Sequence, residues 1–414
     1  MFRFLKRLFG GGEQRPVAAG PPRYVMPTDG EPRSLGNPES CIAPSPENLR
    51  AFDARHLAPF RHAPDRRRSY GLPEINSPDE LWRFLGLSGF KELAFLAQPD
   101  NIAGGMIAHR DYKRLLHYHI RAIPKKDGGE RLIASPRPRL KKVQRRIHRE
   151  ILAKIPLHPA ATGFRRGKSI ADHAGPHVGH QVVAAWDLRD FFPSISQRRT
   201  ASFFRWLGYP ASVARILSLL TTTCTGTPGV RATRHLPQGA PTSPALANAM
   251  AFRLDVRLAG LARRFGATYT RYADDLAFSG DEDFKRGLSR FIPLVEKIVR
   301  SEGFRIHPGK RRFMRRGRRQ CLTGLNVNER LSVGRTEIDA LKAILHNAGK
   351  AGSLESQNRD GRADFAAHVR GRIAWVERFH PARGAKLRAA FAALHQHPGP
   401  VEPTIPLPQA PPPE

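Results

Sequence analysis

The spacing of hydrophobic and polar residues predicts an ordered body between about residue 76 and about residue 396, with irregular chain on both sides. Order begins at SPDELWRFLGL, where Ser77 is an expected helix N-cap, Pro78 takes the first helical position and Glu80 completes a capping box. The flanking segments are rich in Pro, with Arg and Gly before the body, and lack periodicity. We therefore predict four segments: a mostly irregular basic extension over residues 1–75, a mixed body over 76–330, a helical unit over 331–396 and a Pro-rich tail over 397–414.

Two alternating stretches predict a β-hairpin in YHIRAIPKKDGGERLIASP, with Lys126 and Arg131 near a turn at residues 127–129. The next stretch, RLKKVQRRIHREIL, has helical periodicity, with aliphatic residues on one face and five cations on the other. No carboxylate precedes Glu150 in this stretch, so repulsion among the cations would be uncompensated. We expect this face to contact phosphates, with a merely solvated face as the alternative.

Three carboxylates lie at the ends of two apolar runs. Residues 182–186 are continuously apolar and predict a buried strand that ends at Asp187. The segment RYADDLAFSG places Asp274 beside Asp275, although each raises the cost of ionising the other. A simple turn could explain this pair, since Asp bonds its own backbone in turns. If the two segments are neighbours in a sheet, however, the three carboxylates meet, and hard oxygen ligands at such a site select Mg²⁺.

Between these runs, LPQGAPTSPALANAMAFRLDVRLAGL predicts a small-residue turn at Gln238 and Gly239, followed by one helix capped by Thr242 or Ser243. Small residues let the backbone approach a flat ligand closely. After LTGLNVN at residues 322–328 the apolar spacing becomes helical again, which predicts a small helical unit.

Composition adds a strong indication of the partner. The chain has 414 residues with 69 Lys and Arg against 36 Asp and Glu, a formal net charge of +33, so nucleic acid is the expected ligand. Three widely spaced cysteines exclude a disulfide framework and a CxxC metal site, and the 17 histidines contain no HExxH motif. We see no run of transmembrane length and no signal peptide, and expect a soluble cytoplasmic protein. The amphipathic opening MFRFLKRLFGGG is expected to dock a partner or fray, with a membrane-surface helix as the alternative.

The order of these elements resembles the fingers and palm of reverse transcriptases, with Lys310 in GFRIHPGKRRF following the YADD hairpin. More narrowly, GFRRGKSI at residues 163–170, LPQGAPTSP at 236–244, YADD and LTGLNVN are similar to the bacterial retron branch, over roughly residues 76–395. The retron signature Asn-Ala-x-x-His reads HAGPH here, with His173 in the Asn place and His177 retained. The later Val-Thr-Gly reads Leu-Thr-Gly.

The resemblance implies an α+β, right-hand polymerase fold, with fingers and an antiparallel-sheet palm over residues 76–330 and a small α-helical thumb over 331–396. Two Mg²⁺ ions would be held by Asp187 and Asp274, with Asp275 in a less direct role. Lys310 could protonate the departing pyrophosphate. The thumb would grip a template–primer duplex through Arg362, Arg370 and Arg372.

Four residues would contact the incoming dNTP by the same resemblance. The ring of Phe192 would occupy the space of a ribose 2′-hydroxyl, with ordinary core packing as the alternative. Gln238 would touch the nucleotide, and Arg131, with Lys126 as a weaker candidate, would hold its triphosphate. Each cation could instead be solvated surface. Asp190 is expected at the surface, outside the catalytic set.

The implied activity is RNA-directed DNA synthesis of the retron type. The enzyme would copy part of a structured non-coding RNA, primed from a 2′-hydroxyl of that RNA, into a branched RNA–DNA product used in phage defence, and an effector protein is a further possible partner. One alternative is a group II intron-like or other bacterial reverse transcriptase, although no maturase or endonuclease module is visible after the thumb. Another is a non-catalytic RNA-binding scaffold or antitoxin, which would gain nothing from three clustered carboxylates that repel phosphate.

Overall fold

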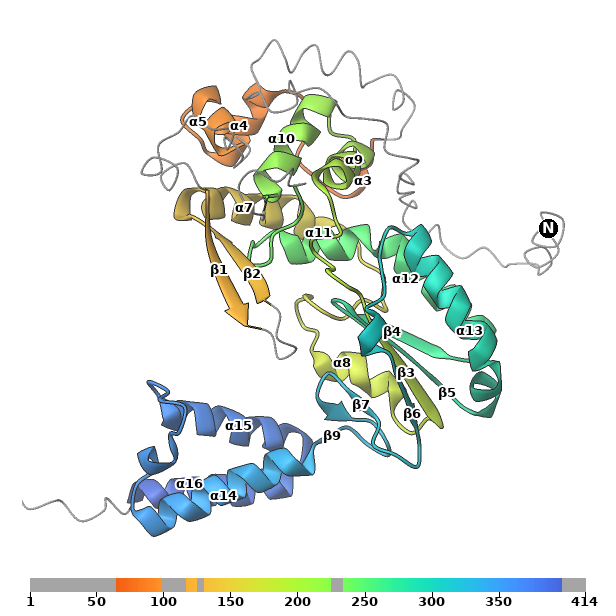
Figure 1. The fold of residues 1–414 in the computed structure, drawn as a ribbon. Coiled ribbons are helices and arrows are strands. Elements are labelled where there is room, and N and C mark those ends of the chain that lie inside the picture. The colour runs from red at the N-terminus through yellow and green to blue at the C-terminus, as the bar shows by residue number, and fades with distance from the viewer. Residues whose placement is uncertain (1–64, 98–116, 125–129, 225–233, 397–414) are drawn as a thin grey trace, which may run out of the picture.

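The computed structural model describes residues 65–97, 117–124, 130–224 and 234–396 of the chain. Within them, helices combine with antiparallel sheets in three parts, which Figure 1 shows from top to bottom. The upper part is mostly helical and carries a β-hairpin. The middle part is a four-stranded sheet with helices packed against it, and the lower part consists mainly of three α-helices.

The upper part begins with three short helices, α3 (Arg66–Ser69), α4 (Pro78–Leu85) and α5 (Phe90–Leu96). The predicted cap of α4 is confirmed, because the Ser77 side chain accepts from the backbone N–H of Glu80. Gly86 ends this helix in the left-handed region, at φ 69°. The Glu80 carboxylate, however, accepts from the backbone N–H of Asn76, so the reciprocal half of the predicted capping box lies one residue earlier.

Helix α3 belongs to the end of the N-terminal extension, and arginine–aromatic contacts hold it against α9 (Gln197–Leu207) and the residues after it. The guanidinium carbon of Arg66 lies 4.4 Å from the centre of the Trp206 ring, and Nη1 donates to the Trp206 carbonyl oxygen. Arg67 lies over the Tyr209 ring and pairs with Asp65 at 2.7 Å. Hydrophobic periodicity cannot reveal such contacts, because they are made by charged side chains.

The predicted hairpin is confirmed as β1 (Tyr118–Pro124) and β2 (Glu130–Pro136), antiparallel with Tyr118 opposite Pro136. Its turn, with Lys126, lies outside the described residues. The predicted basic helix is α7 (Pro138–Glu150), which buries Leu140, Val143 and Ile147. Its cations lie mostly on the solvent side, as the periodicity predicts.

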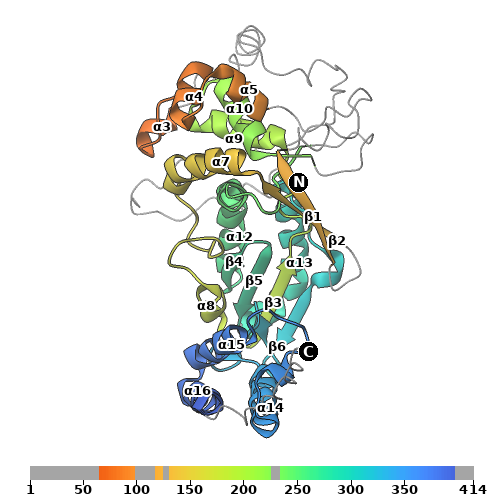
Figure 2. The same cartoon turned by 90° about the vertical axis from the view of Figure 1, so that its left-hand side faces the viewer.

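The middle part is built on a sheet with the strand order β4-β5-β3-β6, in which every neighbouring pair is antiparallel (Figures 1 and 2). Its strands are β3 (Val182–Asp187), β4 (Thr268–Tyr272), β5 (Asp275–Gly280) and β6 (Arg312–Arg315). Alternation along β3 sends Trp186 to one face, where its ring meets Phe278 at 5.2 Å. Helix α13 (Glu282–Ser301) covers that face with Phe291. The opposite face, with Val183 and Ala185, shares a second core with the lower part.

Short helices connect the upper and middle parts. The one helix predicted after the small-residue turn is in fact two, α11 (Ser243–Met250) and α12 (Phe252–Arg264), because Ala251 leaves helical geometry at ψ 1°. Both pieces keep the predicted apolar residues buried, so the hydrophobic repeat does not reveal the break. Helix α10 (Ala211–Thr221) packs against α9 in the upper part (Figure 1). The remaining short elements are η3 (Leu152–Lys154), α8 (Ile170–Ala174), η4 (Gly175–His177) and η5 (Pro308–Lys310).

The lower part follows a small antiparallel sheet of β7 (Cys321–Leu322), β8 (Leu325–Asn326) and β9 (Ser332–Val333). The predicted helical unit is confirmed, with Leu341, Val369 and Val376 in its core. It contains α14 (Arg335–Ala351), η6 (Glu355–Gln357), α15 (Phe365–Phe379) and α16 (Pro381–Gln396). Across the described ranges, none of the helices has the length and apolar character needed to cross a membrane.

Candidate active site

The register of the central sheet brings the three acidic residues to one end of it. Asp187, the last residue of β3, lies directly opposite Asp275, the first residue of β5. Asp274 precedes Asp275 in the tight turn after β4, and its carbonyl oxygen accepts from the backbone N–H of Leu188 at 2.9 Å. The conditional prediction that the two apolar segments are sheet neighbours is therefore confirmed.

Burial and mutual repulsion shape the charge of this cluster. Burial, with the charges of Asp274 and Asp187, raises the pKa of Asp275 to about 6. Burial and the charge of Asp187 also raise the pKa of Asp274. Lys310 acts in the opposite direction on both groups, and its Nζ lies 3.3 Å from Asp187 Oδ2. The cluster therefore holds more negative charge than its surroundings neutralise.

The donor set suits a hard divalent cation. All three side chains offer carboxylate oxygens, and burial together with mutual repulsion raises the pKa of Asp274 and of Asp275, so a dication would stabilise their charged forms. In the described part of the chain, no three His, Cys, Asp or Glu side chains are already arranged around one metal position. Mg²⁺ commonly binds through one or two carboxylates and completes its shell with water and substrate phosphates. The carboxylate oxygens of the site therefore suit a hard divalent cation.

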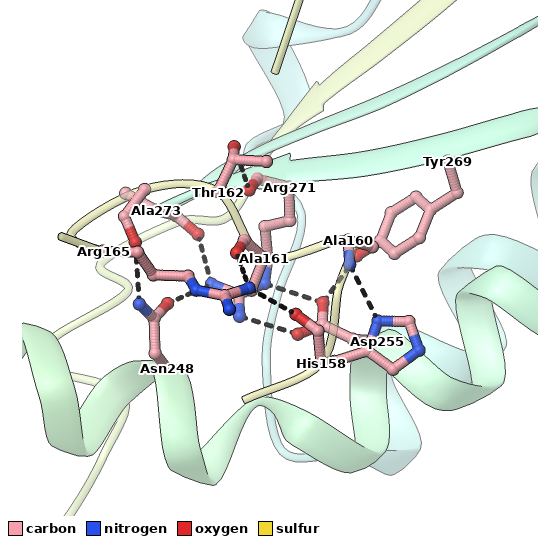
Figure 3. Close-up of polar contacts among 11 residues, drawn as sticks. His158, Ala160, Ala161, Thr162, Arg165, Asn248, Asp255, Tyr269, Arg271 and Ala273 are labelled. Carbon is pink, nitrogen blue, oxygen red and sulfur yellow. Dashed lines mark hydrogen bonds and ion pairs between the residues drawn. The ribbon is translucent and has the colours of Figure 1, made fainter. Parts of the chain in front are cut away.

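We call residues 273–275 the acidic turn. Figure 3 shows an ion pair between Arg271 and Asp255, with Ala273 of this turn beside it. Arg271 and Asp255 are both fully buried and form two parallel contacts, Nη2–Oδ2 at 2.7 Å and Nε–Oδ1 at 2.8 Å. Nη1 of Arg271 also donates to Asn248 Oδ1 at 2.9 Å and to the carbonyl oxygen of Ala273 at 3.0 Å. Tyr269 donates its hydroxyl to the same Asp255 at 2.8 Å. This arginine therefore ties α11, α12 and the acidic turn together.

The pattern of the sequence does not predict this pair. Asp255 lies four residues after Ala251 in an amphipathic helix, where a carboxylate is normally exposed. Arg271 directly precedes the YADD segment, in a chain where cations are abundant. A signal in the sequence was its place between Thr270 and Tyr272, in a short stretch of residues that favour strands.

Residues 160–163, which precede the central sheet in the chain, pack against Arg271 and the acidic turn. The backbone of Arg271 donates to the carbonyl oxygen of Ala160 and accepts from Thr162, both at 2.8 Å, which forms a short parallel bridge. Gly163, the first residue of GFRRGKSI, has no room for a side chain, because a Cβ there would lie 2.6 Å from the backbone nitrogen of Ala273. The motif thus begins with glycine because the turn packs directly on its backbone.

The HAGPH segment forms a buried hydrogen-bonded chain on the same strands. Nε2 of His177 and Nδ1 of His173 both lie 2.7 Å from the hydroxyl oxygen of Thr270 on β4. Nδ1 of His177 lies 2.7 Å from the hydroxyl oxygen of Ser279 on β5. Neutral rings satisfy these contacts if the two ring N–H groups donate to Thr270, which donates to the His173 carbonyl, while Ser279 donates to His177. Both histidines are therefore structural, and His173 supplies through Nδ1 a contact that an Asn amide could also make.

Among the residues predicted to contact the nucleotide, Arg131 lies close enough to the carboxylates to act on Asp274. Arg131 is exposed on β2, and its charge lowers the pKa of Asp274 against the larger effect of burial. The carbonyl oxygen of Gln238 accepts from the backbone N–H of Ala134 at 2.7 Å, which joins the small-residue turn to the hairpin. Gly239, at φ +117°, allows this approach, because a Cβ there would lie 3.1 Å from the Ala134 carbonyl oxygen. Lys126 lies outside the described residues.

Phe192 lies in an aromatic cluster beyond the end of β3. Its half-buried ring is 5.5 Å from Phe191 and 5.9 Å from Phe164, which is itself 49% exposed. Phe191 is buried against Phe304. Asp190 turns outward at φ +49° and pairs with Arg189, as expected for a surface carboxylate. Phe192 therefore has one side in the core and one side available to a ligand.

An antiparallel sheet that ends in crowded carboxylates, with a basic hairpin beside them, is the arrangement of a nucleotide polymerase. Residues 123–341 match the family model described as "Reverse transcriptase (RNA-dependent DNA polymerase)", and the chain belongs to this family. Two relatives from Myxococcus xanthus are similar over most of their length. The Retron Mx65 reverse transcriptase is 40% identical over 77% of this chain and 72% of its own, and the Retron Mx162 reverse transcriptase is 36% identical over 80% and 70%. The chain is thus an RNA-directed DNA polymerase of the retron type.

Among solved structures, telomerase from Candida albicans in complex with a fragment of telomeric RNA aligns with 67% of this chain and 55% of its own. The sequence identity is 12% and the TM-score is 0.40, a likeness too small to support an argument about this enzyme.

The buried ion pair gives a first prediction. Asp255→Ala should lower the free energy of unfolding by about 3–5 kcal/mol, because it leaves the Arg271 guanidinium buried without its counter-charge. Denaturant unfolding of both proteins measures the difference. Asp283→Ala, which removes the partner of the exposed Arg286, is the matched control and should cost no more than about 1 kcal/mol. Equal losses in the two variants would contradict the structural role assigned to Asp255.

The histidine chain gives a second prediction, about pH. Burial lowers the pKa of His173 to about 4 and that of His177 to about 3, so stability that is fully present above the ordinary pKa of 6.5 is lost as the pH falls below it. His173→Asn removes one of these titrating groups and keeps a hydrogen-bonding side chain. The variant should therefore lose less stability than the wild type between pH 7.5 and pH 5, as thermal melting will measure. His119→Asn, at an exposed position, is the control and should follow the wild type. A parallel loss in His173→Asn would show that this ring does not titrate on unfolding.

Proposed function

We propose that this enzyme copies part of a structured non-coding RNA into a branched RNA–DNA product that serves in phage defence in the cytoplasm. The retron relatives support this proposal, since the chain covers more than two thirds of each. We assign the upper part and the hairpin to the fingers, the central sheet to the palm and the lower helical unit to the thumb. The single observation that carries the catalytic assignment is the register that sets Asp187 opposite Asp275, beside Asp274 and Lys310.

The carboxylates are proposed to hold the metal ions, most directly through Asp187 and Asp274. Two Mg²⁺ ions, when bound, would supply activation of the primer hydroxyl and neutralisation of the leaving pyrophosphate. The protein's part is to hold these carboxylates rigidly. Arg271 fixes the carbonyl of Ala273, and the Asp274 carbonyl is bonded to Leu188, so the acidic turn keeps one conformation before the substrate arrives.

Lys310 and Arg131 are proposed to serve the phosphate groups of the nucleotide. Lys310 sits in η5, and Asp187 holds its ammonium group at the acidic end of the sheet. From this position it could give a proton to departing pyrophosphate. Arg131 reaches the same end from the fingers side, and Gln238 is placed next to β2 by its carbonyl contact. Together these residues would frame the nucleotide between the hairpin and the sheet.

The predicted thumb cations have different surroundings. Arg372 is paired with Glu337 at 2.6 Å, and Arg362 is paired with Asp360 at 3.3 Å. Arg370 is exposed and makes no ion pair with a described residue. Arg370 is therefore the member of the predicted set best placed to meet a phosphate of the template–primer duplex.

The metal-binding role is tested by substitution. Asp187→Asn and Asp274→Asn should each reduce dNTP incorporation on a primed RNA template by at least about a hundredfold, because each removes a charged ligand of the metal clamp. RNA affinity should change little, since it rests on the cations. Asp190→Asn changes a nearby exposed carboxylate and should retain activity. Full activity in both first variants would refute the assignment.

Phe192 is proposed to exclude nucleotides that carry a 2′-hydroxyl, and the sugar preference of the enzyme tests this role. Phe192→Ala should raise the use of rNTPs relative to dNTPs by about tenfold or more, because it opens the space beside the 2′ carbon. The ratio of kcat/KM values for dGTP and rGTP on the same template–primer measures the change. Melting temperature is the check on folding, since part of the ring is in the core. An unchanged ratio in a folded variant would show that Phe192 is only a packing residue.

A further inference from the structure

The chain carries a second concentration of charge that the catalytic role does not use. In KRRFMRRGRR, residues 310–319, seven of ten residues are Lys or Arg, and no Asp or Glu occurs between residues 303 and 328. Three of them, Arg315, Arg316 and Arg318, lie at the end of β6 and in the turn after it. We call these three residues the arginine turn.

The arginine turn lies at the opposite end of the sheet from the carboxylates. Along β6, Arg312 is opposite Ala185 and Arg315 is opposite Val182, and the backbone N–H of Arg316 then donates to the carbonyl oxygen of Gln181. Val182 and Asp187 are the two ends of β3, so roughly 17 Å of strand separates this turn from the catalytic end. Because β6 is an edge strand, one side of it has no neighbour within the sheet (Figures 1 and 2).

One asparagine holds the turn in shape. Nδ2 of Asn328, the last residue of LTGLNVN, donates to the carbonyl oxygens of Arg316 at 3.2 Å and Arg318 at 2.8 Å. Its Oδ1 accepts from the backbone N–H of Gln320, and the buried Gln320 side chain donates to the carbonyl oxygens of His180 and Met314. The backbone under the arginines is therefore preorganised, although the side chains lie on the surface.

The arginine turn has no ion-pair partner among the described residues, unlike Lys310 and Arg311. Lys310 pairs with Asp187, Arg311 pairs with Glu296, and Arg319 donates to Asn326. The side chains of the arginine turn are exposed and make no hydrogen bond or ion pair with a described residue.

Two further side chains define the surroundings of the turn. Asp281, which follows β5, lies at the same end of the sheet as the arginine turn. Its carboxylate does not pair with these arginines, because it accepts from the backbone N–H of Gln181 and contacts His180. Phe313, on the same face of β6 as Arg315, is 44% exposed.

We propose that the arginine turn is a second RNA-binding surface of the enzyme, which takes the phosphate backbone of the structured RNA away from the catalytic end. The proposal rests on the RNA-copying function proposed above. Guanidinium groups bind phosphate through a planar fork, and a rigid backbone reduces the entropy lost on binding. An exposed aromatic ring beside them can stack on an unpaired base. These features favour RNA over an acidic protein as the occupant.

The test separates this surface from the active site. The probe is the non-coding RNA transcribed beside the gene, and the quantity measured is the slope of log affinity against log salt concentration. In the triple variant Arg315→Ala, Arg316→Ala, Arg318→Ala this slope should be smaller in magnitude than in the wild type by about 2 to 3. The matched control removes three exposed cations that are already paired, through Lys285→Ala, Arg286→Ala and Arg335→Ala, and should change the slope by less than about 1. Asn328→Ala should reduce affinity several-fold with no change of charge.

A short substrate, oligo(dT) annealed to poly(rA), isolates the catalytic end. The triple variant should extend it within about twofold of the wild-type rate, because these arginines lie far from the carboxylates. A slope equal to that of the control would overturn the proposal. The proposal would also be overturned if the triple substitution weakened binding to poly-glutamate and left binding to the RNA unchanged, since this result would assign the surface to an acidic protein. A wild-type enzyme unable to extend the short substrate would instead refute the proposed function.

Discussion

The buried ion pair between Arg271 and Asp255 is the interaction on which the acidic end of the sheet depends. An isolated charge in this core would be prohibitively costly, so each partner requires the other and both require the backbone that surrounds them. Through Arg271 the pair connects β4 to α11, and through Asp255 it connects both to α12. A further N–H of Arg271 donates to the carbonyl oxygen of Ala273, which makes the position of the acidic turn a consequence of core packing.

This support matters because the acidic turn is unfavourable by itself. Ala273 adopts φ 57°, a region that residues with a Cβ rarely occupy, and the adjacent carboxylates repel one another at partly buried positions. Left to local preferences, the turn would relax and separate its charges. The bridge to Ala160 and Thr162 and the histidine contacts on Thr270 oppose that relaxation from the other side. The surrounding structure thus stores unfavourable electrostatic energy that a bound cation can release.

The sequence predicts those parts of the molecule that depend on local periodicity. The run before Asp187, the hairpin with Arg131 and the basic helix were all confirmed, because alternation and helical spacing are properties of neighbouring residues. The break at Ala251, the burial of Asp255 and the hydrogen bonds of His173 were not predictable in this way. Each depends on a partner from a distant segment, and a polar side chain in an amphipathic pattern is ordinarily exposed. Periodicity identifies the elements, whereas buried polar contacts fix how they join.

The cations of the chain also fall into two groups, those with contacts inside the fold and those without. Some cations are structural, such as Arg271 with Asp255 and Arg66 over Trp206, and their charge is already balanced or screened by contacts inside the fold. Others, such as Arg370 and the arginine turn, have no such contacts with the described residues. The central sheet therefore has uncompensated negative charge at one end and uncompensated positive charge at the other. A polyanion is repelled from the carboxylates unless a metal ion intervenes, and is attracted to the opposite end without one. The sheet is thus electrostatically polar, and under the proposal of a second RNA-binding surface this polarity would favour approach of the RNA at the end that carries the arginine turn.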